Sequence, residues 1–239
     1  MRLLKGWSPK AVGLLAAAVT VTIWTAFIVI ARAAADPARG GVLSPWDIML
    51  ARVLGASLVL LPWGFLLVRR DRAAGRQGSS LFGLSPLPLK PTLLAGLFGG
   101  LLYGVLAYNG FVFAPAGHAS VLMPGSLPLW TALLALLFLG DRINRTRALG
   151  LGLIVGGGLL VGGSSLLRAF EGGVVWKGDL LFMTAALCWG SYSVVARHHR
   201  LDAVRATIAV TALAFVVYVP SYLVLLALGL APDHFFSAP

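Results

Sequence analysis

Seven long apolar segments dominate this sequence, and each is long enough to cross a membrane as a helix. They lie at roughly 11–31, 48–68, 92–113, 119–140, 148–167, 178–197 and 207–230. The hydrocarbon core of a bilayer is about 30 Å thick and requires about 20 consecutive apolar residues of helix. The connections between the segments are short. The sequence therefore predicts an all-α integral membrane protein, built as a compact multi-span helical bundle.

Composition excludes a soluble domain. Hydrophobic residues make up 59% of the 239 residues and charged residues 11%, against about 45–50% and about 25% in soluble proteins. The net charge of +11 comes from basic residues spread between the apolar segments, which argues against nucleic acid as a partner. The single cysteine, Cys188, excludes an internal disulfide and a paired-cysteine metal site. We expect no metal and no other cofactor.

The lysines and arginines predict the orientation of the bundle. Fourteen of them fall before the first segment and in the second, fourth and sixth connections, and four fall in the opposite set. Cytoplasmic connections carry the excess of positive charge. We therefore expect a bacterial inner-membrane protein with a cytoplasmic N-terminus. The first segment is followed by three alanines at 33–35, as in a signal peptide, but its 21 uncharged residues exceed the usual length of a signal core.

The first and sixth segments share a pattern. Residues 23–32 and 188–197 have a Trp, a Val, an Ala and an Arg in common at an offset of 165 residues, and Phe27 falls opposite Tyr192. Because an odd number of helices separates the two copies, they enter the membrane from opposite sides. Such inverted-topology repeats are typical of secondary transporters, in which the substrate site lies near the midplane between the halves.

The fourth and fifth segments carry the most specific resemblance, which is to the EamA-type transporters of the drug/metabolite transporter superfamily. That family shows a proline in helix four, then a Gly-Glu-Arg turn, then glycines at set spacing. The matching residues here are Pro128, Gly140, Asp141, Arg142, Gly150 and Gly157. Arg52 and Trp24 match a family arginine early in helix two and a tryptophan in helix one. Aspartate replaces the glutamate of the turn and keeps its charge.

The resemblance implies a fold of inverted five-helix repeats, with seven of ten helices present. Residues 1–167 would form the first repeat and residues 168–239 part of the second, as a fragment or as a short protein that needs a partner. It also implies a secondary transporter, not an enzyme, that exports amino acids, other small metabolites or drugs by alternating access. The expected partners are a small-molecule substrate and the lipid bilayer, and a homodimer stays open.

Three alternatives belong to other classes. The chain could be a truncated copy that transports nothing, or an assembly partner. A seven-helix receptor agrees with the number of segments, but the predicted orientation and the lack of lysine in 207–230 oppose a retinal protein. A membrane enzyme would need a catalytic cluster, and no hydrolase or metalloprotease motif is present.

Two aromatic pairs are the leading candidates for the substrate site. Trp24 and Phe27 share a helix face, and so do Trp189 and Tyr192 by the repeat. Facing each other, they would wall a cavity for a planar or apolar substrate. Core packing or an interfacial aromatic belt is the alternative. Further candidates for substrate contact are Tyr103, Asn109, Ser120, Pro124 and Ser193.

The prolines of the fourth segment and Asn109 each allow two interpretations. Pro124 and Pro128 lie inside the fourth segment and each removes a backbone hydrogen bond. They indicate either a broken helix that lines the pathway or a packing kink. Asn109 is the one amide well inside a span, where it serves either the substrate or a neighbouring helix.

Two ionisable residues complete the set. His118 opens the fourth segment, where histidine could gate the pathway or carry a proton, or lie solvated at the interface. Arg52 lies four residues into the predicted second segment. We expect it to snorkel outward or to pair with Asp47 or Asp36, and binding of an anionic substrate is the sharper alternative.

Overall fold

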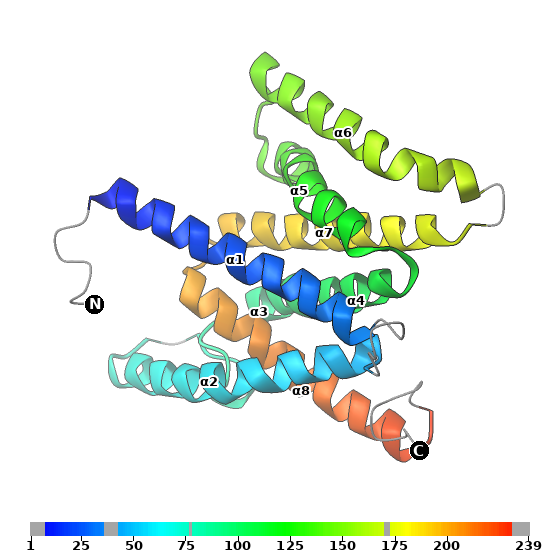
Figure 1. Cartoon of the computed structure of the whole chain (residues 1–239). Coiled ribbons are helices and arrows are strands. Elements are labelled where there is room, and N and C mark those ends of the chain that lie inside the picture. The colour runs from blue at the N-terminus through cyan, green and yellow to red at the C-terminus, as the bar shows by residue number, and fades with distance from the viewer. Residues whose placement is uncertain (1–7, 36–42, 77, 170–172, 231–239) are drawn as a thin grey trace.

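The computed structural model describes residues 8–35, 43–76, 78–169 and 173–230, and it is helical along most of them (Figure 1). The elements in chain order are α1 (Pro9–Ala35), α2 (Pro45–Ala73), η2 (Leu81–Gly83), α3 (Leu89–Gly96), η3 (Leu97–Leu102), α4 (Tyr103–Phe113), α5 (Ala116–Leu139), α6 (Arg145–Ala169), α7 (Val175–His198) and α8 (Ala203–Ala227). Within the described residues, six stretches are long and apolar enough to cross a membrane: α1, α2, α3 to α4, α5, α7 and α8. The 25-residue α6 covers the fifth predicted segment. The chain is an all-α, multi-span membrane protein, as predicted.

Local sequence decides where two of these helices begin and end. Ser44 caps α2: its hydroxyl accepts the N–H of Asp47, and the Asp47 carboxylate accepts the N–H of Ser44. Pro45 takes the first helical position, where its missing N–H costs nothing. Gly140 ends α5 with a φ of 69°, a conformation that favours glycine. The Ser44 cap places the start of α2 at Pro45, three residues before the predicted boundary at 48.

The third span contains a π-helical stretch, η3, between α3 and α4. Two glycines of this stretch allow close contacts with the neighbouring helices. A Cβ on Gly99 would stand 2.9 Å from the Tyr192 ring, and one on Gly100 would stand 3.0 Å from Val210. Single π-turns inside α-helices recur at functional sites. Here the π-turn and its glycines bring the third span against both α7 and α8.

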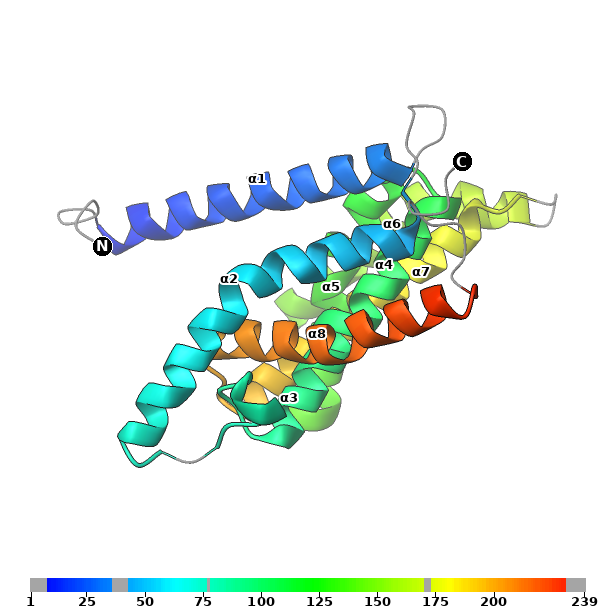
Figure 2. The same ribbon diagram turned by 90° about the horizontal axis from the view of Figure 1, so that it is seen from below.

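The helices pack in two principal pairs around α4. The α5 helix packs along α7, and α2 packs along α8, while α6 covers α5 from the outside (Figure 1). The α2 helix bends midway (Figure 2), and it contains Pro62. The α1 helix lies at one edge of the bundle (Figure 2). Among its described side chains, the buried ones are Ile28 and Ala31, in the half toward Ala35.

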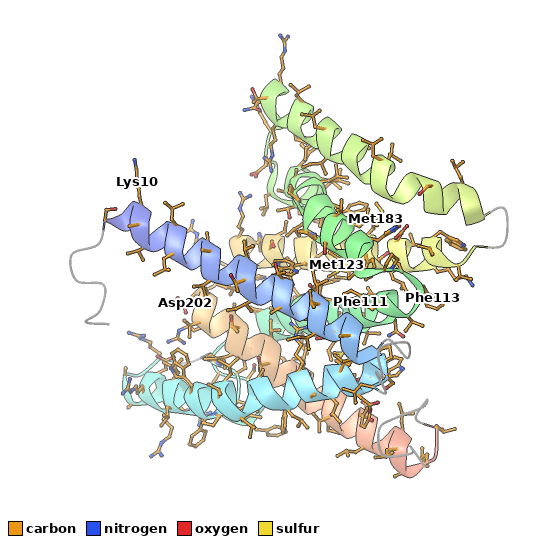
Figure 3. All side chains as sticks on the ribbon, in the orientation of Figure 1. Lys10, Phe111, Phe113, Met123, Met183 and Asp202 are labelled. Atoms are coloured by element: carbon orange, nitrogen blue, oxygen red, sulfur yellow. The ribbon has the colours of Figure 1, made fainter. Side chains whose placement is uncertain are left out.

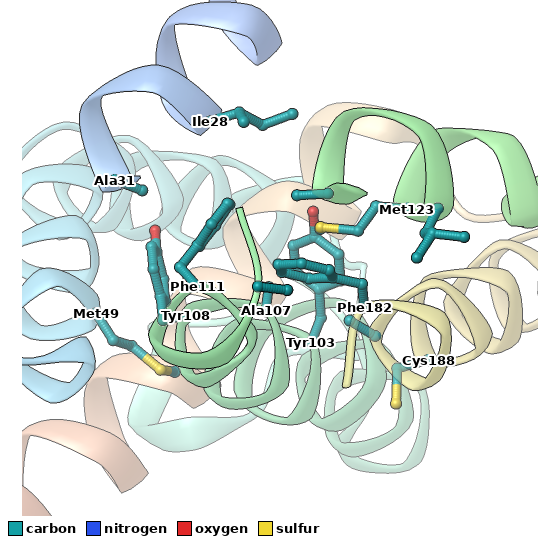
Figure 4. Close-up of a cluster of buried hydrophobic side chains, with 14 of the residues drawn as sticks. Ile28, Ala31, Met49, Tyr103, Ala107, Tyr108, Phe111, Met123, Phe182 and Cys188 are labelled. Carbon is teal, nitrogen blue, oxygen red and sulfur yellow. The ribbon is translucent and has the colours of Figure 1, made fainter. Parts of the chain in front are cut away.

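A cluster of buried hydrophobic side chains occupies much of one half of the bundle. Side chains from α1, α2, α4, α5, α7 and α8 meet there (Figure 4), with the rings of Phe111 and Phe182 5.1 Å apart. We call this half, where α2 begins and α1 ends, the Asp47 end. The opposite half, where α2 ends and α8 begins, is the Asp71 end. Phe113 lies at the Asp47 end, and Lys10 and Asp202 lie at the other (Figure 3).

A close contact between α4 and α7 gives a test of this packing. A Cβ on Gly178 would stand 2.7 Å from the carbonyl oxygen of Gly110 and closer still to the Cβ of Ala114. We expect Gly178→Ala to lower the free energy of unfolding by about 1–3 kcal/mol, because backbone atoms cannot yield to the added methyl. Unfolding in mixed micelles measures this.

Gly152→Ala is the matched control, since a Cβ at Gly152 meets nothing within 4 Å. It should raise stability by up to about 1 kcal/mol through helix propensity. Equal effects of the two substitutions would contradict the close approach of α7 to α4.

Candidate functional site

A cavity of about 380 Å³ lies between α1 and the helices α2, α4 and α7. Its size falls in the range of about 300–1,000 Å³ that is usual for small-molecule sites. The lining residues come from four helices: Thr20, Ile23, Trp24, Phe27, Arg52, Tyr103 and Trp189. The predicted aromatic residues Trp24, Phe27, Tyr103 and Trp189 therefore lie around one space. Their role in binding stays a prediction.

Trp189 is at the centre of the aromatic group. Its ring centroid lies 4.9 Å from that of Tyr103, 5.3 Å from that of Tyr192 and 6.3 Å from that of Trp24. These separations are typical of favourable aromatic pairs. Phe27 lines the same cavity and packs against Tyr108, with the ring centroids 5.7 Å apart. The two tryptophans that match at the repeat offset are thus the pair that meets.

A second cavity, of about 200 Å³, adjoins the first and shares Arg52 and Trp189 with it. Gly99 and Gly100 of η3 form part of its wall, and Tyr192 lies on the α7 side. Thr207 and Thr211 of α8 add hydroxyl groups. Arg52 and Trp189 therefore lie between the two cavities. Together the cavities extend from α1 to α8.

Arg52 points into the bundle rather than toward the end of its helix. Its guanidinium carbon lies 5.9 Å from the ring centroid of Tyr103 and 6.0 Å from that of Phe27. Because α2 begins at Pro45, Arg52 is about 10 Å along the helix, seven residues at about 1.5 Å each. Its guanidinium lies beside the two rings at this depth, and outward snorkelling stays a prediction.

The expected ion pair between Arg52 and Asp47 is wrong. Asp47 is buried, and its carboxylate accepts hydrogen bonds from Ser44 and from the hydroxyl of Tyr222 on α8. The other expected partner, Asp36, lies outside the described residues. Among the residues that the structure describes, no carboxylate forms an ion pair with Arg52.

Four of the predicted contacts are not brought to either cavity. Asn109 donates to the carbonyl of Val105 in its own helix, at 2.8 Å, and Ser193 donates to that of Trp189, at 2.9 Å. Ser120 and Pro124 are exposed on α5. The polar side chains satisfy themselves within their own helices, which needs no partner across the bundle.

The prolines do not interrupt the fourth span. The α5 helix runs without a break through Pro124 and Pro128, and both are exposed. The broken-helix interpretation is wrong, since an exposed proline at these positions leaves the packed face of α5 intact. Ser126 and Met123, which are buried, lie on that packed face.

His118 has a partner that the sequence reasoning missed. Its Nδ1 lies 2.7 Å from a carboxylate oxygen of Asp179, which is 4% exposed, and the contact joins α5 to α7 at the Asp47 end. Asp179 falls inside the apolar segment predicted at 178–197. An acidic residue within a predicted span was the signal that could have found it, because such residues are buried only with partners.

The α2–α8 pair is joined at both ends. At the Asp71 end, both Asp71 oxygens accept from the Arg205 guanidinium, at 2.6 and 3.0 Å. At the Asp47 end, Tyr222 donates to Asp47, and the Tyr218 hydroxyl donates to the carbonyl of Trp46, at 2.8 Å. The two cavities lie between these contacts.

The Gly-Asp-Arg turn joins α5 to α7 at the Asp71 end. Arg197 donates from both terminal nitrogens to the Asp141 carboxylate, at 2.9 and 3.2 Å. These hydrogen bonds and the positive charge hold the pKa of the Asp141 carboxyl below its ordinary value. The spaced glycines behave differently. A Cβ on Gly150 or Gly157 would meet nothing within 4 Å, so their spacing does not serve close packing within the described residues.

A bundle of membrane-spanning helices around a mid-depth aromatic cavity has the form of a membrane transport protein. The model of the EamA-like transporter family matches residues 11–163, well over half of the chain. The chain therefore belongs to the EamA-like transporter family and is a membrane transporter of the drug/metabolite type. Comparisons with curated proteins and with solved structures return no match.

The His118–Asp179 contact can be measured by a double-mutant cycle. We expect His118→Ala and Asp179→Ala each to lower the free energy of unfolding by about 1–3 kcal/mol, because each leaves a buried polar group without this partner. The double variant should lose less than the sum of the two. Thr184→Ala is the control on α7, since the Thr184 hydroxyl donates to the carbonyl of Leu180 in its own helix. Strict additivity would show that the two side chains do not interact.

The Asp141–Arg197 pair predicts a pH-dependent difference in stability. The folded-state pKa of Asp141 is depressed below the unfolded value of about 3.9. Its contribution is therefore complete above that value and is lost as the pH falls through the folded-state pKa. Asp141→Asn should unfold more readily than the wild type at neutral pH, and the two should converge in acid. A difference that stays constant down to the acid limit would contradict the ion pair.

Proposed function

We propose that this protein exports a small organic metabolite across the bacterial inner membrane by alternating access between two inverted repeats. Amino acids, other metabolites and drugs are the substrate classes that the family resemblance supports. We place the N-terminus in the cytoplasm, on the strength of the positive-charge count. The Asp47 end then faces outward and the Asp71 end faces the cytoplasm.

One observation carries the proposal. Trp24 of α1 and Trp189 of α7, which match at the repeat offset, line the same cavity with their rings 6.3 Å apart. Corresponding residues of two inverted repeats meet at the repeat axis, where transporters of this build place their substrate. Apolar and aromatic walls with few polar groups suit an organic molecule.

The position of the core cluster supports a conformation that is closed to the outside. Ile28 and Ala31, in the turns of α1 after Phe27, are buried in that cluster, as are Phe111 and Phe182. None of these four side chains lines either cavity, and they lie toward the Asp47 end. Opening toward the outside would require these side chains to separate. We propose that the His118–Asp179 hydrogen bond, in the same region, takes part in this gate.

Trp189 is the residue whose removal tests the site. We expect Trp189→Ala to lower transport by about tenfold or more, because the ring packs against three other aromatic side chains around the cavity. The measurement is uptake of radiolabelled amino acids, nucleosides, cationic drugs and phenylacetate into proteoliposomes, expressed per amount of folded protein.

Trp63→Ala is the matched control. Trp63 lies on α2, is 47% exposed and lines neither cavity, so its removal should leave transport unchanged. Absence of flux for every solute tested would refute the proposed function. Equal loss in both variants would refute the assignment of the site.

A further inference from the structure

Arg52 differs from the other cations that the structure ties into the bundle. Arg197 and Arg205 each have a carboxylate partner, Asp141 and Asp71 respectively. Arg52 has none among the described residues, although it lies inside a span and is exposed to the two cavities. Charged side chains within spans face a watery cavity and pair with an opposite charge there. The position opposite Arg52 is therefore a place for an anion.

The groups around Arg52 are hydrogen-bond donors. The Arg52 guanidinium carbon lies 5.9 Å from the ring centroid of Tyr103, whose hydroxyl can donate a hydrogen bond. The indole N–H of Trp24 is buried and has no hydrogen-bond partner among the described residues. No aspartate or glutamate lines either cavity in the part of the chain that the structure describes. Such a set satisfies a carboxylate and offers no counter-charge to an ammonium group.

We propose that Arg52 binds the carboxylate of the transported substrate, which is a monoanionic organic acid with an apolar or aromatic body. The inference rests on the proposed function and names the substrate class of the same site. The carboxylate would lie against Arg52, where a guanidinium binds both oxygens at once. The body would lie among the rings of Trp24, Tyr103 and Trp189. Zwitterions and cations are disfavoured, since none of the described lining residues balances a positive charge.

The same arrangement links binding to closure of the cavity. An empty cavity keeps the Arg52 charge in water, and withdrawal of that charge from water is costly without a partner. A bound carboxylate neutralises it and supplies the hydrogen bonds that water provided. Only the loaded protein then closes around the site with its charges paired. This coupling makes movement of the helices depend on the presence of the anion.

The test compares two probes of one shape with a related zwitterion. Phenylacetate, phenylacetamide and zwitterionic phenylalanine share a ring and differ in charge. Binding of each to the full chain in lipid nanodiscs is measured by titration calorimetry. We expect the wild type to prefer phenylacetate to phenylacetamide by about tenfold or more. Arg52→Gln should remove that preference, and Arg52→Lys should keep it at reduced affinity.

Arg69→Gln is the matched control. Arg69 is on the same helix and lies over the ring of Phe65 at 5.8 Å, but it lines neither cavity. It should leave the preference unchanged. If Arg52→Gln does not fold, the ratio of the affinities for phenylacetate and phenylacetamide in the wild type and in Arg52→Lys still tests the anion site. Equal affinity for the acid and its amide, tighter binding of the zwitterion, or no saturable binding of phenylacetate would overturn the inference.

Flux in proteoliposomes separates this inference from the proposed function. Arg52-dependent binding of phenylacetate without transport of any solute would refute the proposed function and leave the anion site standing. Transport of neutral or cationic solutes that Arg52→Gln does not change would refute the anion site alone.

Discussion

The structure depends on the pairing of polar and charged side chains between neighbouring helices. Two helix pairs are joined in this way at both of their ends. The α2–α8 pair has Asp71 with Arg205 at one end and Asp47 with Tyr222 at the other. The α5–α7 pair has Asp141 with Arg197 and His118 with Asp179. Interhelical polar contacts are worth only about 0.6–2 kcal/mol each in membranes. Their value here is that they fix which helices run together.

The cavity follows from this pattern of contacts. Polar contacts hold α2 to α8 and α5 to α7 near the two surfaces of the membrane, and the middle of the bundle is left to aromatic side chains, Arg52 and the glycines of η3. At that depth η3 approaches α7 and α8 through its glycines, and Trp189 turns toward α1. The α1 helix is packed only in its half toward Ala35. This half of α1 covers the cavity, and the half of α1 toward Pro9 does not close it.

The helices could be predicted from the sequence because hydropathy and length decide them in a membrane. The meeting of Trp24 with Trp189 followed from the repeat offset, since symmetry relates residues that no local pattern connects. Helix ends were less accessible. The start of α2 depends on a capping box at Ser44, and a shift of three residues there carried Arg52 from the membrane surface into the bundle.

The parts of the site that the sequence did not reveal depend on long-range geometry. His118 and Asp179 are 61 residues apart, and neither has a motif that names the other. Asn109 and Ser120 looked like pathway residues because polar groups are rare in spans, yet each bonds back to a carbonyl of its own helix. The exposed prolines of α5 likewise led to the wrong prediction of a broken helix. Each proline removes one backbone hydrogen bond, but α5 continues through both of them.

Arg52 and Arg197 show how a membrane protein assigns different roles to one residue type. Arg197 is the counterpart of Arg32 in the repeat, and the Gly140 turn brings Asp141 within reach of it, so the family turn acts as a clamp between α5 and α7. Aspartate in place of glutamate keeps the negative charge that pairs with Arg197. Arg52 has no such carboxylate among the described residues, and aromatic rings hold it toward the cavity. A cation that the fold pairs stabilises the fold, whereas a cation that the fold leaves without an acid in a donor-lined cavity is available to a substrate.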